Sequence, residues 1–287
     1  MEYTNPEALV STEWLAEHLD APDVRVVDAS WYLPTDERDP AAEYAVQHIP
    51  GAVRFDIDEI ADTDSPLPHM LPSPEKFSSR MRKLGLGDGN RIVVYDGGVM
   101  MAASRAWWML RLFGHDDVAV LDGGMNKWLA EGRTVADLPT PPRERHFTAR
   151  QNSTMVRSVD QVVTNLASRG EQVVDARARA RYEGSAPEPR AGLRSGHIPG
   201  SVCLPFVELL NEDKTMKSAD AVAEAFKTAG LDLKQPIIAS CGSGVSASFL
   251  ALALHLIGHR RTSVYDGSWS EWGGREDLPI ETGPART

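Results

Sequence analysis

Cys241 opens a short loop between an apolar stretch that predicts a strand and a longer stretch that predicts a helix. The loop continues as Gly242, Ser243, Gly244, Val245 and Ser246. Its two glycines permit backbone conformations that other residues avoid, so several N–H groups can turn toward one point. These groups and the dipole of the following helix favour an anion, such as the thiolate of a cysteine. The pattern therefore predicts an exposed, nucleophilic Cys241; the alternative is a buried structural cysteine before an ordinary helix cap.

The chain holds one other cysteine, Cys203, which follows a turn and is expected to be a buried, inert thiol. Two cysteines make no disulfide framework, and reduced thiols favour a cytoplasmic location. No spacing of histidine, cysteine and acidic residues predicts a metal site, and no dinucleotide-binding or Walker fingerprint is present. We therefore expect chemistry that uses no metal and no other cofactor.

The composition is that of a globular protein, with 42% hydrophobic and 25% charged residues in a chain of 287. The net charge of −11 argues against nucleic acid or an anionic membrane surface as a partner. The first residues show neither the basic nor the apolar stretch of a secretory signal. The longest apolar run, residues 249–254, is too short to span a bilayer, so no membrane partner is expected.

The two halves of the chain repeat each other in order. The matching segments are residues 26–29 with 173–176, 48–53 with 197–202, 112–115 with 256–259, 121–124 with 265–268, and Trp128 with Trp272. A repeat this long indicates duplicated domains and not a solenoid. We expect an N-terminal domain at residues 1–138, a linker at 139–152 and a C-terminal domain at 153–287.

Each half alternates short apolar strands with helices. Strands are predicted at residues 25–28, 91–95 and 118–121, then at 172–175, 236–240 and 262–265. Helices are predicted at residues 11–18, with Ser11 or Thr12 as N-cap, at 43–47, 74–84 and 102–113, then at 159–167, 219–229 and 247–257. This alternation predicts an α/β fold in which each domain is a mostly parallel sheet flanked by helices. In such a fold the site lies at the carboxyl ends of the strands, where Cys241 falls.

The halves differ at the loop. The position that matches Cys241 in the first half is Asp96, so only the second domain carries a thiol for cysteine chemistry. We expect the first domain to be a non-catalytic wall of the cleft.

These features together resemble a two-domain rhodanese-type sulfurtransferase, over essentially the full chain. The resemblance rests on two His-Ile-Pro-Gly turns, on Asp-Gly-(Gly/Ser)-x-x-x-Trp endings and on the Cys241 loop. Within that family the neutral loop is similar to that of 3-mercaptopyruvate sulfurtransferases, because thiosulfate-preferring members usually carry basic residues there. Further similar segments are residues 28–34, 55–58, 69–72 and 188–190. Ser246 departs from the family's usual threonine, a change between two small hydroxyl residues.

The resemblance implies a double displacement. Cys241 would attack the sulfur of 3-mercaptopyruvate, pyruvate would leave, and a persulfide would pass its sulfur to a thiol, such as thioredoxin, or to cyanide. The loop residues Gly242, Gly244, Val245 and Ser246 would hold the substrate and the persulfide through their amides.

Arginines would bind the keto acid. Taken alone, Arg177, Arg179 and Arg181 indicate a solvated basic loop. The resemblance assigns substrate binding to Arg181 and Arg190, whose paired planar donors suit a carboxylate, and leaves Arg177 and Arg179 structural. Arg105 is a third substrate-binding candidate, with a structural ion pair as the alternative.

The resemblance also implies a catalytic relay of Asp58, His69 and Ser243, in which Ser243 polarises the substrate or assists proton transfer. The alternative from the residues alone places His69 on a proline-rich surface loop and makes Asp58 a helix cap.

Three other functions compete with this interpretation. Cysteine phosphatases and arsenate reductases need arginine six residues after the cysteine, and here that residue is Ala247, so we exclude them. Thiosulfate:cyanide sulfurtransferase activity uses the same Cys241 chemistry with another donor. A non-enzymatic sulfur carrier or scaffold is the third, and the intact Cys241 loop argues against it.

Overall fold

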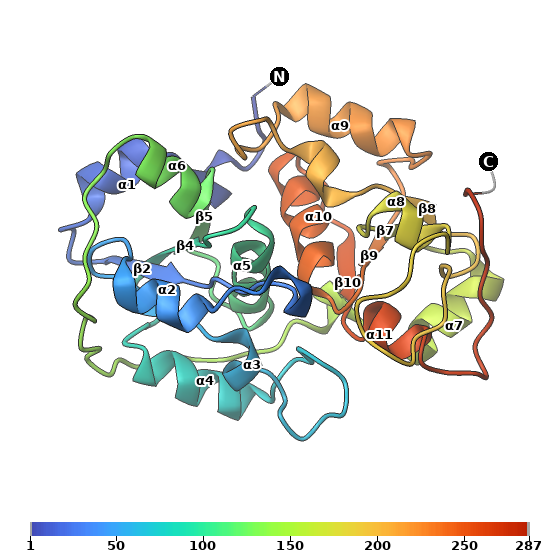
Figure 1. Cartoon of the computed structure of the whole chain (residues 1–287), viewed down its shortest axis with the longest axis horizontal. Coiled ribbons are helices and arrows are strands. Elements are labelled where there is room, and N and C mark those ends of the chain that lie inside the picture. The colour runs from blue at the N-terminus through green and yellow to red at the C-terminus, as the bar shows by residue number, and fades with distance from the viewer. Residues whose placement is uncertain (1, 286–287) are drawn as a thin grey trace.

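The computed structural model describes residues 2–285, which fold into two lobes, each built on one five-stranded sheet (Figure 1). The first sheet has the order β1-β5-β4-β2-β3, from β1 (Leu9–Val10), β2 (Val24–Asp28), β3 (Val53–Arg54), β4 (Arg91–Tyr95) and β5 (Val118–Leu121). The second has the order β6-β10-β9-β7-β8, from β6 (Val156–Arg157), β7 (Gln172–Asp175), β8 (Val202–Cys203), β9 (Ile237–Ser240) and β10 (Thr262–Tyr265). Every described strand pair is parallel, which confirms the predicted α/β architecture.

Helices cover both sheets. The first lobe contains α1 (Thr12–His18), α2 (Pro40–Val46), α3 (Ile57–Ile60), α4 (Pro74–Lys83), α5 (Met101–Leu112) and α6 (Gly124–Ala130). The second contains α7 (Val159–Ser168), α8 (Arg179–Tyr182), α9 (Ala219–Thr228), α10 (Val245–Leu256) and α11 (Ser268–Trp272). Single 3-10 turns lie at η1 (Pro6–Ala8), η2 (Pro34–Asp36), η3 (Ser153–Met155) and η4 (Phe206–Leu209).

Several helices begin where the sequence places capping residues, whereas α5 and α10 have no side-chain cap. Ser11 caps α1 by accepting a hydrogen bond from the Trp14 amide at 3.1 Å, and Ser158 forms a capping box with Gln161 at α7. These local signals explain why the predicted bounds of the long helices agree with the structure to within a few residues. The short elements α3, α6, α8 and α11 lay outside the prediction because they are positioned mainly by tertiary packing.

The central strands β4 and β9 are almost entirely buried, as expected for parallel strands with helices on both faces. Each of these strands ends at the carboxyl edge of its sheet, where a loop leads into the next helix, from β4 to α5 and from β9 to α10. The duplicated topology therefore gives each lobe a strand–loop–helix unit at its carboxyl edge, and the second unit carries Cys241.

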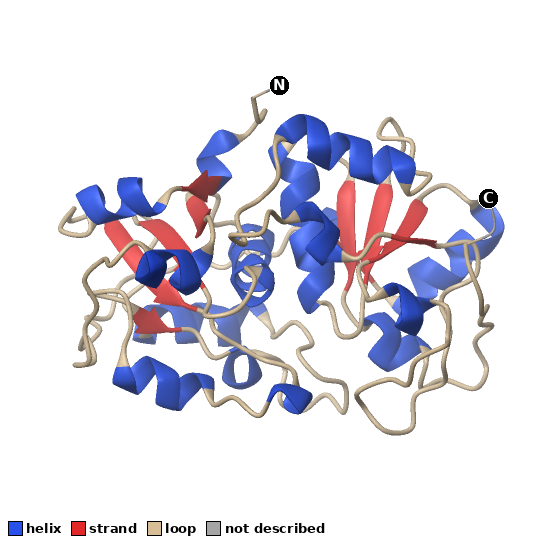
Figure 2. Ribbon diagram, turned by 45° about the horizontal axis from the view of Figure 1, so that its top comes forward, coloured by secondary structure: helices blue, strands red, loops and turns tan. Residues whose placement is uncertain are grey.

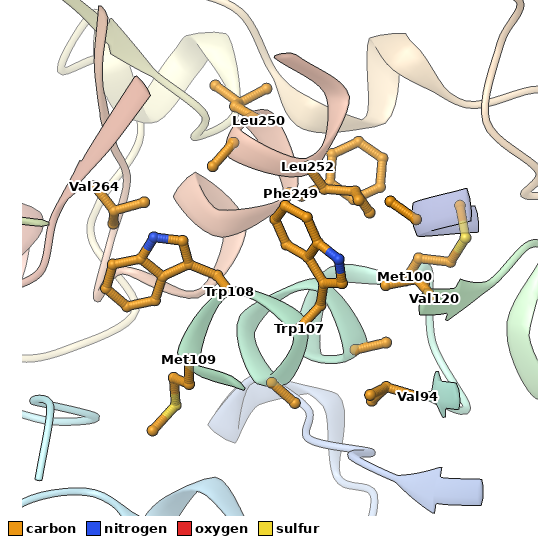
Figure 3. Packing of buried hydrophobic residues seen from close by; sticks show 14 of the residues in the cluster. Val94, Met100, Trp107, Trp108, Met109, Val120, Phe249, Leu250, Leu252 and Val264 are labelled. Carbon is orange, nitrogen blue, oxygen red and sulfur yellow. The ribbon is translucent and has the colours of Figure 1, made fainter. Parts of the chain in front are cut away.

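Helices α5 and α10 lie side by side between the two sheets (Figure 2) and join the lobes through one apolar cluster. Trp107 and Trp108 of α5 pack beside Phe249 and Leu250 of α10 in that cluster (Figure 3). All four side chains are at most 2% exposed. The two lobes thus share one apolar cluster, and each lobe also contains a second cluster of its own.

Two further segments tie the lobes together. Near the N-terminus the amide of Thr4 donates to the carbonyl of Leu256 at 2.8 Å, so residues from the first half lie on the end of α10. Between α6 and η3 the chain runs without helix or extended strand, and Phe147 from this stretch packs edge-on against Phe77 of α4. The expected linker at residues 139–152 falls inside this stretch.

Candidate active site

The Cys241 loop connects the end of β9 to the start of α10. Gly244 precedes the helix with φ of +77°, a conformation that favours glycine. A Cβ atom at Gly244 would lie 2.8 Å from Nη1 of Arg105 and 2.9 Å from the carbonyl oxygen of Asp266. The close approach of the first lobe therefore requires glycine at this position.

Cys241 is buried, since the residue is only 1% exposed. This corrects the expectation of an exposed sulfur. The amides of Cys241 and Gly244 each donate to Oγ of Ser268 at 3.1 Å, and that oxygen lies 4.0 Å from Sγ of Cys241. The expected ring of amides around the sulfur is therefore incomplete, since these two amides are already bonded to Ser268.

Other amides of the loop remain available. Within residues 2–285 the backbone N–H groups of Gly242, Ser243, Val245 and Ser246 have no hydrogen-bond partner. They belong to the loop and to the first turn of α10, where unpaired donors and the helix dipole favour negative charge.

The first lobe shows what a loop of this kind does with an anion. Asp96 occupies the position of Cys241, and its buried carboxylate accepts hydrogen bonds from the amides of Gly98, Met100 and Ala103 at 2.9 to 3.0 Å. Burial nevertheless raises the pKa of Asp96, with the three amides acting against that rise. The loop of the first lobe thus binds its own carboxylate, whereas the Cys241 loop keeps its free amides.

Ser243, His69 and Asp58 form a relay that crosses between the lobes. Nδ1 of His69 lies 2.9 Å from Oγ of Ser243, and Nε2 lies 3.1 Å from Oδ1 of Asp58. An ionised carboxylate only accepts hydrogen bonds, so Nε2 carries the proton and Nδ1 accepts one from the Ser243 hydroxyl. The relay predicted from the family resemblance is therefore assembled in the structure, two residues from Cys241.

Burial and hydrogen bonding set the protonation states of His69 and Asp58. Burial lowers the pKa of His69, and the hydrogen bond to Asp58 acts against that fall. The hydrogen bond from His69 in turn lowers the pKa of Asp58. Both directions favour a neutral imidazole beside a carboxylate at neutral pH.

The alternative placements of His69 and Asp58 do not fit the structure. His69 is 4% exposed and is therefore buried, not on the surface. Asp58 lies inside α3, where Asp56 is the N-cap and accepts from the Asp58 amide at 3.0 Å.

Arg105 holds the backbone of His69 in place. His69 adopts φ of +61°, which is uncommon for a residue with a side chain, and Nη2 of Arg105 donates to its carbonyl at 2.6 Å. The same guanidinium pairs with Asp266 at 2.7 Å, and the Arg105 side chain is fully buried. This geometry favours the structural ion pair over the direct substrate contact expected for Arg105.

Arg190 is the unpaired cation of the site. It borders a hollow of about 350 Å³ together with Trp31, Tyr32, Asp58 and His69. Within residues 2–285 its side chain makes no hydrogen bond or ion pair, unlike that of Arg181, which pairs with Glu188. Burial lowers the pKa of Arg190, and the negative charges of Cys241 and Asp58 act against that fall.

Arg181 lies near the loop but is already paired. Its Nη2 is 2.5 Å from Oε2 of Glu188, and a Cβ at Gly242 would lie 3.2 Å from the same nitrogen. A substrate contact by Arg181 is thus compatible with its position and competes with the Glu188 ion pair.

Arg177 has the structural position that the resemblance left to it, and it is not part of the solvated basic loop that the residues alone indicated. It is 2% exposed, binds Asp175 at 2.6 Å and Glu188 at 2.7 Å, and stacks on Trp269. Arg179 is exposed and pairs with Glu208 at 2.9 Å. Trp269 is fully buried under Arg177 and does not border the hollow.

Sequence reasoning missed Ser268 and Asp266, which hold the loop and Arg105. Their signal was present in the repeat, since Asp266 and Ser268 match Asp122 and Gly124 of the first half. The change from glycine to serine at the second of these positions marks the half that carries the thiol.

The second thiol is inert by its surroundings. Burial raises the pKa of Cys203 to about 12, so this residue stays a thiol at neutral pH. No three residues of the histidine, cysteine or acidic types are arranged to hold a metal within residues 2–285. In the same part of the chain, no helix has the length and apolar character needed to cross a membrane.

Comparison with known proteins identifies the family. The rhodanese-like domain matches residues 11–131 and again 158–275. The chain belongs to the rhodanese family. As a two-domain rhodanese it is 47% identical to rat thiosulfate sulfurtransferase, over 96% of this chain and 94% of that protein. It is 43% identical to Escherichia coli 3-mercaptopyruvate sulfurtransferase, over 95% of this chain and 97% of the other.

A solved structure supports the same assignment. The crystal structure of Escherichia coli SseA, described as a 3-mercaptopyruvate sulfotransferase with the rhodanese fold, matches with a TM-score of 0.84 and 40% identity. The match covers 91% of this rhodanese chain and 98% of SseA. Fold and family are therefore those predicted from the repeated motifs.

Proposed function

We propose that the protein is a sulfurtransferase that takes sulfur from 3-mercaptopyruvate through a persulfide on Cys241. The observation that carries the proposal is the relay from Asp58 through His69 to Ser243, which ends beside Cys241. Such a relay is useful for a donor whose leaving group must gain a proton. The relatives named 3-mercaptopyruvate sulfurtransferase support the choice of donor.

The chemistry divides into two displacements. The Cys241 thiolate attacks the sulfur of 3-mercaptopyruvate, a sulfur–sulfur bond forms, and the carbon–sulfur bond breaks with its electron pair left on carbon. The resulting enolate takes a proton and becomes pyruvate, while Cys241 holds a persulfide. An acceptor thiolate or cyanide then attacks the outer sulfur and releases the Cys241 thiolate.

Each lobe supplies part of this reaction. The C-terminal domain, which we place at residues 153–287, provides Cys241, the free loop amides and Arg190. The N-terminal domain, placed at residues 1–138 before the linker at 139–152, provides Asp58 and His69. Neither domain contains the whole set.

Arg190 is the main group for the substrate carboxylate. It is unpaired, half-buried and shares its hollow with Asp58 and His69. Arg181 joins it by exchanging its Glu188 partner for the substrate. Two arginines provide the paired donors that a keto acid can accept.

The relay acts on the leaving group. Ser243 donates to Nδ1 of His69 in the resting site and can pass its hydroxyl proton to the enolate carbon or oxygen. It regains a proton from the S–H group of the new persulfide, which leaves the charge on the persulfide, while Nδ1 of His69 holds the hydroxyl in position. The free amides of Gly242, Val245 and Ser246 stabilise the charge on the persulfide. No step calls for a metal or a cofactor.

The acceptor is proposed to be a thiol, such as thioredoxin, or cyanide. Because the two cysteines of the chain are both unpaired, we propose a reducing, cytoplasmic location.

Intact-protein mass spectrometry tests the proposal. The protein is exposed to 3-mercaptopyruvate or to thiosulfate, and the expected result is a gain of one sulfur atom that Cys241→Ser lacks and Cys203→Ser keeps. Pyruvate release is measured in parallel. The proposal fails if 3-mercaptopyruvate leaves the wild-type mass unchanged.

Thiosulfate is the second candidate donor, because the rat relative is named thiosulfate sulfurtransferase. Rates with both donors on one preparation decide between them. A third function, a sulfur carrier or scaffold without turnover, predicts a persulfide that forms once and is not passed to cyanide.

A further inference from the structure

Ser268 binds the Cys241 loop from the first turn of α11. Its Oγ accepts hydrogen bonds from the amides of Cys241 and Gly244, both at 3.1 Å, and donates to the carbonyl of Tyr265 at 2.7 Å. A hydroxyl has one proton and two acceptor sites, so these three bonds use its full capacity. Sγ of Cys241 lies 4.0 Å away, and the shorter Tyr265 contact holds the proton.

Ser268 makes these bonds in a conformation that disfavours a side chain. Its φ is +47°, in the left-handed region, and the residue is fully buried. The matching residue of the first lobe is Gly124, with φ of +56°. The half that has no thiol thus uses glycine at this position, and the half with Cys241 keeps a serine despite the conformational cost.

The rest of the loop explains what the serine does. In the first lobe the Asp96 carboxylate gathers three amides by itself. The second lobe has no such internal anion, so its loop amides need another group to fix their directions. Ser268 takes two of them and leaves the amides of Gly242 and Ser243 without a protein partner.

We propose that Ser268 is a positioning residue for sulfur transfer: its hydroxyl fixes the amides of Cys241 and Gly244 so that the remaining loop amides stay free for the charge on the sulfur. This inference rests on the proposed function. Ser268 acts through the loop backbone and touches neither the keto acid nor the relay. Its loss therefore affects the persulfide step more than substrate binding.

The test compares Ser268→Gly with wild type. Glycine suits the left-handed conformation and reproduces the first lobe, so the variant is expected to keep the wild-type Tm or exceed it. With 3-mercaptopyruvate we expect kcat to fall about tenfold or more while KM stays close to wild type, because Arg190 still binds the donor. We also expect the pH profile of Cys241 alkylation by iodoacetamide, followed by intact mass, to move to higher pH. Cys203 does not compete, since its pKa is about 12.

Two further variants separate the hydroxyl from general damage. Ser268→Thr restores the hydroxyl and is expected to recover part of kcat, whereas Ser268→Ala is not. Ser270→Ala is the matched control from the same helix, because its Oγ donates to the Gly242 carbonyl at 2.7 Å and accepts no loop amide. Its alkylation profile is expected to stay near wild type.

The outcomes are distinct. A Ser268→Gly protein with wild-type kcat and an unshifted alkylation profile overturns the inference, as does a Ser270→Ala profile that moves equally far. If wild type itself transfers no sulfur, the proposed function fails, and the alkylation profiles still decide the role of Ser268. If Ser268→Gly loses its fold, the Thr and Ala variants give the same comparison.

Discussion

Replacing Asp266 with alanine tests the ion pair that joins the two lobes behind the site. Asp266 binds Nη2 of Arg105 at 2.7 Å and accepts from the Leu71 amide at 2.8 Å. The Arg105 side chain is fully buried and the Asp266 side chain is 6% exposed. The substitution therefore leaves a guanidinium charge in the core with its carboxylate partner removed.

The size of the loss follows from this burial. Removing one partner of a buried ion pair costs about 3–5 kcal/mol, because the remaining charge is uncompensated. The carbonyls of His69 at 2.6 Å and Gly244 at 3.4 Å still solvate Arg105, which favours the lower end. We expect Asp266→Ala to lower the free energy of unfolding by about 3 kcal/mol.

Urea unfolding followed by tryptophan fluorescence and circular dichroism measures that loss. Coincident curves from the two probes are expected, because α5 and α10 share one core. The double variant Arg105→Met, Asp266→Ala removes the stranded charge and should recover about 2 kcal/mol relative to the sum of the single variants. A loss below about 1 kcal/mol for Asp266→Ala, or strict additivity in the double variant, would refute the reasoning.

Three further predictions concern the relay, the substrate cation and acid stability. Asp58→Asn should lower kcat about tenfold or more. It should also move the acid limb of the pH–rate profile to lower pH, because the hydrogen bond to Asp58 raises the pKa of His69. An acid limb at the wild-type pH would contradict the relay. Arg190→Met should raise KM for 3-mercaptopyruvate by about tenfold or more, while the exposed control Arg179→Met should not; equal effects would remove Arg190 from the substrate site. Burial lowers the pKa of His255 to about 4, so the unfolded chain takes up a proton first as pH falls from 6.5 toward 4. Between pH 7 and pH 5 the free energy of unfolding of His255→Gln should therefore fall by about 1 kcal/mol less than that of wild type, after allowing for the partial exposure of His255. Urea titrations at both pH values measure this difference. Identical pH slopes for the two proteins would exclude a contribution from His255.

The sequence predicted what local chemistry determines. Serine caps, glycine stops and apolar runs placed the long helices and strands, and the repeat placed two sheets. The strand–loop–helix unit put Cys241 at the carboxyl edge of the second sheet. The family resemblance added Asp58, His69 and Ser243, which composition and spacing alone would have left on separate surfaces.

Long-range contacts escaped prediction. Arg177 follows Asp175 in sequence, but its burial depends on Glu188 and on Trp269, which lies far along the chain. Arg105 and Asp266 come from different lobes, and no sequence pattern within one half predicts their ion pair.

The burial of Cys241 was not predicted either, because it also depends on long-range contacts. A loop with two glycines suggested an open site, whereas Cys241 is 1% exposed and its sulfur lies 4.0 Å from Oγ of Ser268. Only the packing of two lobes decides how much of that residue solvent reaches.

The shared core of α5 and α10 has a consequence for any attempt to separate the two copies. The first copy carries the imidazole of His69 and the carboxylate of Asp58, and the second carries the thiol of Cys241. Cutting the chain between the copies would uncover the apolar faces of both helices and divide this set of residues. We therefore expect neither copy to work as an independent domain.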